Sequence, residues 1–287
     1  MTAPDITSFF DEATNSVSYL VSDPESRAAV VIDAVLDFDQ ASGTISTKSS
    51  DRIIATAAEQ GLRIEWVLDT HVHADHLSAA ARVREQTGAE VGIGTGVKVV
   101  QAAFGPMFGA EDLADEDFDR LFDDGATVSL GDLTVEVMAT PGHTPACVSY
   151  KIGDAVFVGD TLFMPDYGTA RTDFPGGDAA QLYRSIQRIF ALPPETRLFL
   201  CHDYKAPGRS EYAWQTTVGE EAERNVHIGN GASEEAFVKL RHGRDATLCA
   251  PKLLYPAIQV NIRGGRLPPA APDGSRFLKI PLTIADA

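Results

Sequence analysis

The chain has few basic residues and no long apolar run. Its 287 residues include 24 lysines and arginines against 41 aspartates and glutamates, which gives a formal net charge of −17. A surface this negative repels phosphate backbones and anionic lipid head groups, so we expect neither nucleic acid nor a membrane surface as a partner. No apolar stretch reaches the length needed to cross a bilayer.

Cysteine is also scarce. The three cysteines are Cys147, Cys201 and Cys249, and no Cys-x-x-Cys pair occurs. An odd number without paired spacing argues against a disulfide framework and indicates a reducing compartment. The first ten residues lack the basic region and apolar run of a secretory signal. We therefore predict a cytoplasmic protein, in which Cys147 and Cys201 are small buried fillers.

Strand and helix patterns alternate along the chain. Short apolar, β-branched runs predict strands, and apolar residues at helical spacing predict helices. The predicted strands are 28–35, 63–69, 90–93, 126–130, 133–139, 146–152, 155–159 and 197–200. The predicted helices are 51–60, 77–86, 179–190, and two around 211–225 and 234–241. This order predicts an α+β fold, with two sheets packed face to face and helices outside.

The organisation beyond these elements is simpler. We expect a single domain over residues 1–287, with 206–287 as a helical, Pro-rich and Gly-rich extension of it. The run 111–124 is acidic with Leu and Phe interleaved, which predicts a solvated helix or loop with an apolar side. A flap over the functional site is the alternative interpretation of this run.

The densest cluster of candidate ligands is His71, His73, Asp75 and His76, directly after a predicted strand and directly before a predicted helix. Histidines two apart in an extended segment point the same way. The turn into the helix then brings Asp75 and His76 back towards the same point. Imidazole and carboxylate together suit zinc, iron or manganese. The cluster therefore predicts a metal site.

Three more candidate ligands follow later strands. They are His143, Asp160 and His202. Taken singly, Asp160 could belong to a turn and His202 could be a surface residue. Together they repeat one theme, with ligands at the point where strands end and loops begin. The remaining histidines, His227 and His242, lie outside the pattern, and we predict ordinary roles for both.

The motifs resemble the metallo-β-lactamase superfamily in their order: His-x-His-x-Asp-His, Gly-His-Thr, Gly-Asp, and a late histidine. The resemblance covers roughly residues 7–205 and implies an αββα sandwich with the metal site at one edge. In the superfamily, one metal is held by the residues matching His71, His73 and His143. A second metal is held by those matching Asp75, His76 and His202, and the residue matching Asp160 bridges the two.

Within the superfamily, two segments resemble the persulfide dioxygenases, the relatives of the mitochondrial ethylmalonic-encephalopathy protein. They are Ala170-Arg171-Thr172-Asp173-Phe174 and His202-Asp203-Tyr204, and the pieces at 234–238 and 256–257, with Asn261 and Arg263, are also similar. The resemblance implies one iron(II) per chain, held by His71, His143 and Asp160. It implies that His73, Asp75, His76 and His202 surround the iron without binding it.

The same resemblance implies an activity. The substrates would be glutathione persulfide, dioxygen and water, and the products would be sulfite and glutathione. Two histidines and one carboxylate leave three coordination positions of iron open for such chemistry. The family commonly forms dimers, so we expect a homodimer.

Arg171 and Tyr204 are the candidate substrate-binding residues. Arg171 either meets the anionic tripeptide and organises the site, or forms an ion pair with Asp173. Tyr204 either contacts glutathione or is a buried tyrosine with a bonded hydroxyl. The loops 36–49 and 161–170 look longer than in the mitochondrial relative, and both can alter the pocket.

The main alternative is a zinc-dependent thioester hydrolase similar to glyoxalase II, which uses the same seven ligands. There, two metals lower the pKa of a bridging water and polarise the carbonyl. A true β-lactamase is less favoured because no export signal is present, and a nuclease because the chain is acidic. A non-catalytic sulfur sensor would have lost metal ligands, and none is lost.

Overall fold

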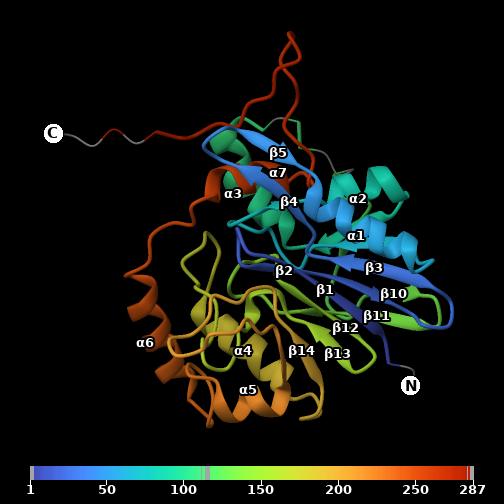
Figure 1. Ribbon diagram of the computed structural model, residues 1–287. Coiled ribbons are helices and arrows are strands. Elements are labelled where there is room, and N and C mark those ends of the chain that lie inside the picture. Colours follow the sequence, from blue (N-terminus) through green and yellow to red (C-terminus); the bar gives the residue numbers. More distant parts are fainter. Residues whose placement is uncertain (1–2, 111, 114–116, 283, 285–287) are drawn as a thin grey trace.

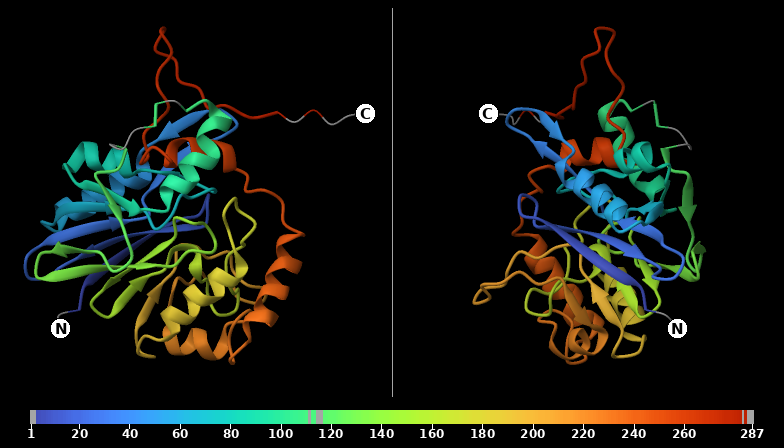
Figure 2. Two further views of the ribbon diagram at one scale, coloured as in Figure 1. Left: turned by 180° about the vertical axis from the view of Figure 1, so that it is seen from behind. Right: turned by 45° about the vertical axis from the view of Figure 1, so that its right-hand side comes forward.

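Two β-sheets stand face to face, and helices cover the outer face of each (Figure 1). The computed structural model describes residues 3–110, 112–113, 117–282 and 284. Seen from behind and from the side, the same four layers remain distinct (Figure 2). The predicted αββα sandwich is therefore confirmed.

The first sheet has the strand order β1-β2-β3-β6-β8-β9. Its bounds are β1 (Asp5–Asp11), β2 (Ser16–Ser22), β3 (Ala28–Ile32), β6 (Arg63–Leu68), β8 (Glu90–Gly94) and β9 (Arg120–Phe122). From β3 to β9 the neighbouring strands run parallel. Helices pack on its outer face: α1 (Lys48–Glu59), α2 (Ala80–Thr87), α3 (Val97–Phe108) and α7 (Leu254–Asn261). Parallel strands direct their carboxyl ends, and the loops that follow, to one edge.

The second sheet has the order β10-β11-β12-β13-β14-β15. Its bounds are β10 (Thr127–Leu130), β11 (Leu133–Ala139), β12 (Val148–Ile152), β13 (Ala155–Phe157), β14 (Arg197–Phe199) and β15 (Gln215–Thr217). Only the β13–β14 pair is parallel, and α4 (Ala179–Phe190) lies in its crossover. The helices α5 (Val218–Arg224) and α6 (Glu234–Asp245) complete the outer layer beside α4.

A third, small sheet is added beside the first. It has the order β5-β4-β7, with the bounds β4 (Val35–Asp39), β5 (Thr44–Ser46) and β7 (Leu77–Ser78). The loop 36–49 singled out in the sequence is thus a β-hairpin, paired to the chain just after the histidine cluster. None of the helices among the described residues is long and apolar enough to span a bilayer.

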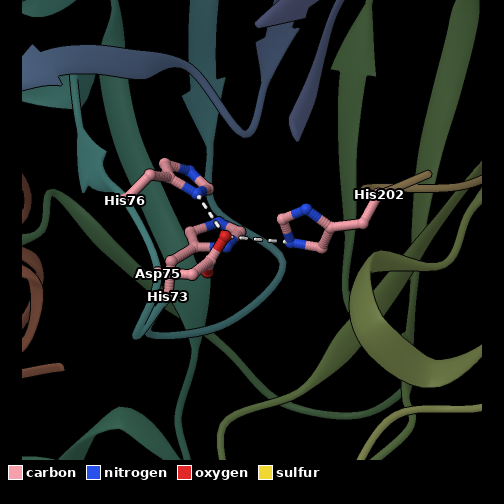
Figure 3. Close-up of side chains that lie close together, drawn as sticks. All are labelled: His73, Asp75, His76 and His202. Carbon is pink, nitrogen blue, oxygen red and sulfur yellow. Dashed lines mark hydrogen bonds and ion pairs between the residues drawn. The ribbon is translucent and has the colours of Figure 1, made fainter. Parts of the chain in front are cut away.

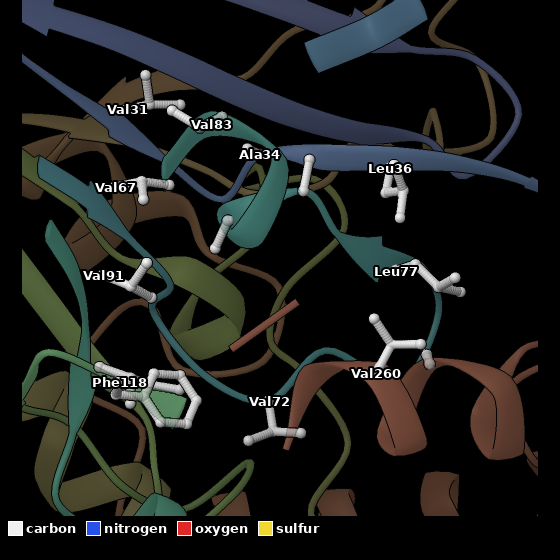
Figure 4. Packing of buried hydrophobic residues seen from close by; sticks show 14 of the residues in the cluster. Val31, Ala34, Leu36, Val67, Val72, Leu77, Val83, Val91, Phe118 and Val260 are labelled. Carbon is white, nitrogen blue, oxygen red and sulfur yellow. The ribbon is translucent and has the colours of Figure 1, made fainter. Parts of the chain in front are cut away.

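Apolar side chains fill three layers of core. One lies between the two sheets, one between the first sheet and its helices, and one between the second sheet and α4, α5 and α6. Figure 4 shows the layer outside the first sheet, where Val83 of α2 faces Val31, Val67 and Val91 of adjacent strands, and Val260 of α7 lies nearer to Leu77. A rigid scaffold of this kind fixes the strand ends from which the functional loops begin.

The structure corrects several predicted elements. The predicted strand 28–35 is two strands, because the chain turns at Asp33 (φ 52°). The predicted helix 77–86 begins as strand β7, because Leu77 pairs with Leu36. The helix predicted around 211–225 begins only at Val218, after strand β15. The helices α3 and α7 were not predicted.

The acidic run 111–124 also differs from the prediction in its described part; residues 111 and 114–116 lie outside the described residues. Asp117 and Phe118 are buried, and residues 120–122 form β9 at the sheet edge. A solvated helix or loop is therefore wrong for this part. The predicted apolar side is present, since Phe118 packs into the core of the first sheet.

Candidate metal centre

The ends of strands from both sheets meet at one edge of the sandwich and bring the seven predicted ligands together. The loop after β6 carries His71, His73, Asp75 and His76, and the other sheet contributes His143, Asp160 and His202. Their donor atoms fall into two main groups, each with all its atoms within 4.8 Å of one another. The first is His71, His143 and Asp160, and the second is His73, Asp75, His76 and His202.

The first group holds two imidazoles against one carboxylate. Nε2 of His71 lies 3.9 Å from Oδ2 of Asp160, and Nε2 of His143 lies 3.6 Å from the same atom. All three side chains are buried. Burial, reinforced by the neighbouring His73, holds the pKa of His71 well below its usual value. The imidazole is therefore neutral at physiological pH, which is the form that binds metals.

The second group surrounds Asp75, as Figure 3 shows. Its Oδ2 lies 3.4 Å from Nδ1 of His76 and 3.4 Å from Nε2 of His202. Burial alone would raise the pKa of Asp75, but the two histidines outweigh it and hold that pKa well below its usual range. The two groups adjoin each other, because Oδ1 of Asp160 lies 3.2 Å from Nε2 of His202.

Apart from the close approach of His202 to Asp75 and Asp160, the donor atoms that face the centre of the site make no hydrogen bond among the described residues. They are Nε2 of His71, Nδ1 of His73, Nε2 of His76, Nε2 of His202 and Oδ1 of Asp160. A buried polar atom without a partner costs about 1–3 kcal/mol. Several such atoms converging on one place fit a metal, and imidazole with carboxylate is a donor set for zinc, iron or manganese.

The opposite ring nitrogens are held by the protein. Nδ1 of His143 donates to the backbone carbonyl of Arg171 at 2.7 Å. Nε2 of His73 lies 3.0 Å from a carboxylate oxygen of Asp33, and Nδ1 of His71 lies 3.0 Å from the Thr70 hydroxyl. Since carbonyls and carboxylates only accept, and the Thr70 hydroxyl already donates to Asp33, these contacts place the proton on the outer nitrogen and leave the inner one free for a metal.

Asp33 was missed by the sequence analysis. It stands in an apolar run that predicts one continuous buried strand. The acidic residue within that run was the one sign of a break in the strand and of a polar role for Asp33. The carboxylate accepts from the backbone N–H of Thr70 at 2.7 Å as well as contacting His73. Burial raises the pKa of Asp33, and the Thr70 hydrogen bonds and nearby histidines oppose that effect.

The histidine loop is also held from its outer side by α7. The side-chain amide of Asn261 donates to the carbonyl oxygens of His73 and His76, each at 2.8 Å, and accepts from the N–H of Ser78 at 2.7 Å. On the other side, the Ser16 hydroxyl lies 3.2 Å from Nδ1 of His76 and 3.3 Å from Nδ1 of His202. The resemblance had singled out Asn261 without indicating this contact.

A cavity of about 830 Å³ opens above both ligand groups. His143, Asp160, Asp75 and His76 line its floor. The β4–β5 hairpin and the loop 161–170 contribute to its walls, as does the chain from Arg244 to Leu253. The cavity is large enough for a small organic molecule. Both predicted substrate-binding residues, Arg171 and Tyr204, line it.

The side chain of Arg171 is fully engaged by the protein. Two of its nitrogens donate to the two carboxylate oxygens of Asp173, at 2.5 and 2.6 Å, and a third donates to the carbonyl of Cys249 at 2.7 Å. This is the ion pair that the sequence left open as an alternative. Arg171 contacts the candidate ligands through its backbone carbonyl, which accepts the hydrogen bond from His143.

Tyr204 is partly open to the cavity, with 38% of its surface exposed. Its ring stacks on His202 at 5.4 Å between centroids and lies 5.3 Å from the ring of Tyr167. Desolvation of the ring in the cavity wall, with the nearby charges of Asp75 and Asp160, raises the pKa of Tyr204 well above its usual value. The residue therefore forms a neutral aromatic wall beside the ligands.

The two buried cysteines stay protonated. Burial raises the pKa of Cys147 to about 12, and raises that of Cys201 well above its usual value. Sγ of Cys201 lies within 4.8 Å of donor atoms of Asp33 and His73, and also of Asp160 and His202. The exposed Cys249 lies apart from these groups.

Residues 12–202 match the family model of the metallo-beta-lactamase superfamily. The chain belongs to this superfamily. A solved structure of ETHE1 from Myxococcus xanthus superimposes with a TM-score of 0.74 and 35% sequence identity, covering 91% of this chain and 100% of that one. Fold and ligand clusters together make the chain a metal-dependent enzyme of the metallo-beta-lactamase fold.

Curated relatives carry different activities in their names. A probable metallo-hydrolase of Burkholderia pseudomallei is 52% identical, over 96% of this chain and 97% of the relative. Glyoxylase B2 of Dictyostelium discoideum is 45% identical over 92% and 91%. The mitochondrial persulfide dioxygenase of Homo sapiens is 30% identical over 91% and 89%. Against a beta-lactamase hydrolase-like protein of Agrobacterium fabrum, 49% identical, this chain spans only 66% of the relative.

Proposed function

We propose that this protein is an iron(II)-dependent dioxygenase that oxidises glutathione persulfide. One glutathione persulfide, one dioxygen and one water give glutathione and sulfite, with release of protons. The outer sulfur is oxidised, the sulfur–sulfur bond breaks, and dioxygen is reduced. Iron(II), when bound, supplies the electron-transfer chemistry that lets dioxygen react with sulfur. His71, His143 and Asp160 would hold it, one iron per chain.

The observation that supports this proposal most is the way His73 is grouped. A zinc site of the hydrolase kind needs His71, His73 and His143 together. In this structure His73 falls with Asp75, His76 and His202, and its outer nitrogen is held by Asp33. What remains around Asp160 is a group of two histidines and one carboxylate, the set typical of non-haem iron oxygenases.

The rest of the site gives roles to the remaining groups. Tyr204, whose ring stacks on the buried His202, lines the cavity beside Asp160 and would orient the persulfide end of the substrate. Asp75, held anionic by His76 and His202, would orient water by accepting its hydrogen bonds and would accept protons near the ligands. His76 and His202 are buried and keep bulk water from this side of the site, which limits hydrolysis of the reactive sulfur compound.

The charges on the cavity walls suit a substrate thiol that has both carboxylate and ammonium groups. Lys48, Arg244 and Lys252 bring positive charge to the walls, although the chain as a whole is strongly acidic. Asp37 and Asp39 of the β4–β5 hairpin bring negative charge to the same cavity. A tripeptide thiol with two carboxylates and one ammonium group is complementary to both kinds of wall.

A zinc-dependent hydrolase of glutathione thioesters is the second candidate. The relatives named as a probable metallo-hydrolase and as Glyoxylase B2 are more similar in sequence than the human persulfide dioxygenase, which favours it. All seven ligands for two zinc ions are present. Two zinc ions would activate a water and polarise a thioester carbonyl.

Oxygen uptake distinguishes the two candidates. Iron-reconstituted protein is given glutathione persulfide while dioxygen and sulfite are measured together. We expect rapid uptake with a matching amount of sulfite, loss of both in His143→Ala, and no change in His242→Ala, a histidine outside the site. Absence of uptake, with cleavage of S-lactoylglutathione by the zinc-loaded protein, would establish the hydrolase instead.

A further inference from the structure

Two charged residues of α6, one helical turn apart, form a buried ion pair. Nη2 of Arg241 lies 2.6 Å from Oδ1 of Asp245, and the two residues are only 2% and 6% exposed. A buried pair gains little from its mutual attraction unless further hydrogen bonds satisfy both groups, because removing two charges from water is costly. The further hydrogen bonds that satisfy Arg241 and Asp245 therefore indicate the role of the pair.

The partners belong to one short loop, residues 169–172. Nη1 of Arg241 donates to the carbonyl of Thr169 at 2.9 Å. Oδ2 of Asp245 accepts from the N–H of Thr172 at 2.9 Å and from its hydroxyl at 3.0 Å. One ion pair thus holds both ends of a four-residue segment. His227 adds a third contact, since its Nδ1 accepts from the N–H of Thr169 at 2.9 Å.

The middle of that segment meets the candidate metal centre. The carbonyl of Arg171 accepts the Nδ1 proton of His143 at 2.7 Å, and the other nitrogen of the ring points to Asp160. The orientation of the imidazole therefore follows the position of this one carbonyl. Contacts of this kind, behind a metal-binding histidine, fix its tautomer and ring angle.

We propose that the Arg241–Asp245 pair is a positioning device for His143. It fixes residues 169–172 so that the Arg171 carbonyl holds the His143 ring with Nε2 towards the metal. The inference rests on the proposed role of His143 as a metal ligand. Both residues of the pair lie beyond residues 12–202, the part of the chain that matches the family model.

An alternative role for Arg241 is direct contact with substrate, because it borders the large cavity. Its two terminal nitrogens are already engaged by Thr169 and Asp245. Asp245 does not line that cavity, so a change at Asp245 separates positioning from substrate contact.

The test uses the metal-loaded, full-length protein and needs no activity assay. The variants are Asp245→Asn, Arg241→Met, the conservative Arg241→Lys, and Ile186→Ala as a control that lowers stability from the α4 core. For each, the rate of metal loss to a chelator and the melting temperature are measured. In metal-free protein, nitrogen NMR reports which nitrogen of His143 carries the proton.

We expect Asp245→Asn and Arg241→Met to lose metal about tenfold faster than the wild type, the usual size of such indirect effects. We expect a mixed His143 tautomer in both, and partial recovery in Arg241→Lys. Ile186→Ala should melt earlier but keep the wild-type rate and tautomer. If Arg241→Met does not fold, Thr172→Val removes one contact of the same loop and should shift both measurements in the same direction.

Two results would overturn the proposal in different ways. If Asp245→Asn melts earlier but its metal loss and tautomer match the Ile186→Ala control, the pair only stabilises the fold, and the proposed function is untouched. If His143→Ala retains metal as firmly as the wild type, His143 is not a ligand, and both the positioning role and the proposed iron site fail.

Discussion

The side-chain amide of Asn261 donates to the carbonyl oxygen of His73 at 2.8 Å, across 188 residues of sequence. The same amide donates to the carbonyl of His76, so the last described helix holds the loop that carries four of the seven ligands. Each contact replaces water around a buried backbone group. The geometry of the histidine loop thus depends on the C-terminal part of the chain.

Replacing Asn261 by alanine should loosen that loop. Two carbonyls and the N–H of Ser78 would lose their buried partner, each at a cost of about 1–3 kcal/mol. We expect a lower free energy of unfolding in denaturant and roughly tenfold weaker metal retention. Gln187→Ala, which removes an exposed amide side chain from α4, is the control. Unchanged metal retention in Asn261→Ala would show that the loop keeps its shape without the amide.

The two ligand groups should respond differently to mutation. If a single iron is held by His71, His143 and Asp160, His71→Ala should abolish iron binding, whereas His76→Ala should retain about one iron per chain. The reason is that the donor atoms of His76 belong to the other group. Metal analysis of the purified variants gives the answer. Equal loss of metal in both variants would indicate a shared, two-metal centre.

Positive charge at the cavity wall should govern affinity for the substrate. Arg244→Glu places a carboxylate on the wall where we propose that glutathione carboxylates bind. We expect KM for glutathione persulfide to rise about tenfold while kcat stays nearly constant, because the chemistry lies deeper in the cavity. Lys239→Glu makes the same charge change on α6 outside that cavity. A drop in kcat alone would contradict this assignment.

Glu221 is a fully buried residue of α5. We expect it to lower the free energy of unfolding as pH rises. Burial raises the pKa of its carboxyl from 4.5 to about 8. Between those values the folded chain holds a proton that the unfolded chain releases, so the free energy of unfolding decreases as pH rises. The full effect is on the order of 5 kcal/mol.

Denaturant titrations between pH 5 and pH 8 measure that effect, with the metal-free protein used throughout. Glu221→Gln carries no titrating proton and should remove most of the decrease. Glu223→Gln, an exposed neighbour on the same helix, should leave it as in the wild type. The same pH dependence in Glu221→Gln and in the wild type would show that Glu221 is already ionised when folded.

The clustering of the seven candidate ligands could be predicted from the sequence because they lie in loops that follow strands with a clear apolar pattern. Asp33 could not, since it interrupts such a pattern and its partner His73 lies 40 residues away. Arg241 and Asp245 have the spacing of an ordinary surface pair on a helix, and only the packed structure shows that both are buried.

The helix α7 could not be predicted because of the residues that flank it in the sequence. Prolines and glycines on both sides favoured a tail, although Pro256 stands in the first turn of the helix, where proline is tolerated. Whether a segment docks depends on apolar contacts with distant strands. Here Ala257, Ile258 and Val260 join the core of the first sheet. Such contacts are a property of the fold and leave little trace in local sequence.

The dependence on Asn261 has a consequence for how the protein acquires its metal during synthesis. The ribosome releases the histidine loop long before α7, so the nascent chain offers its imidazoles as a flexible cluster. A flexible cluster selects metals by affinity alone, an order in which zinc and copper exceed iron(II). Only the finished chain imposes a geometry that can favour another ion. Late metal loading, after the C-terminal helix has docked, would therefore protect the proposed iron site from zinc and copper.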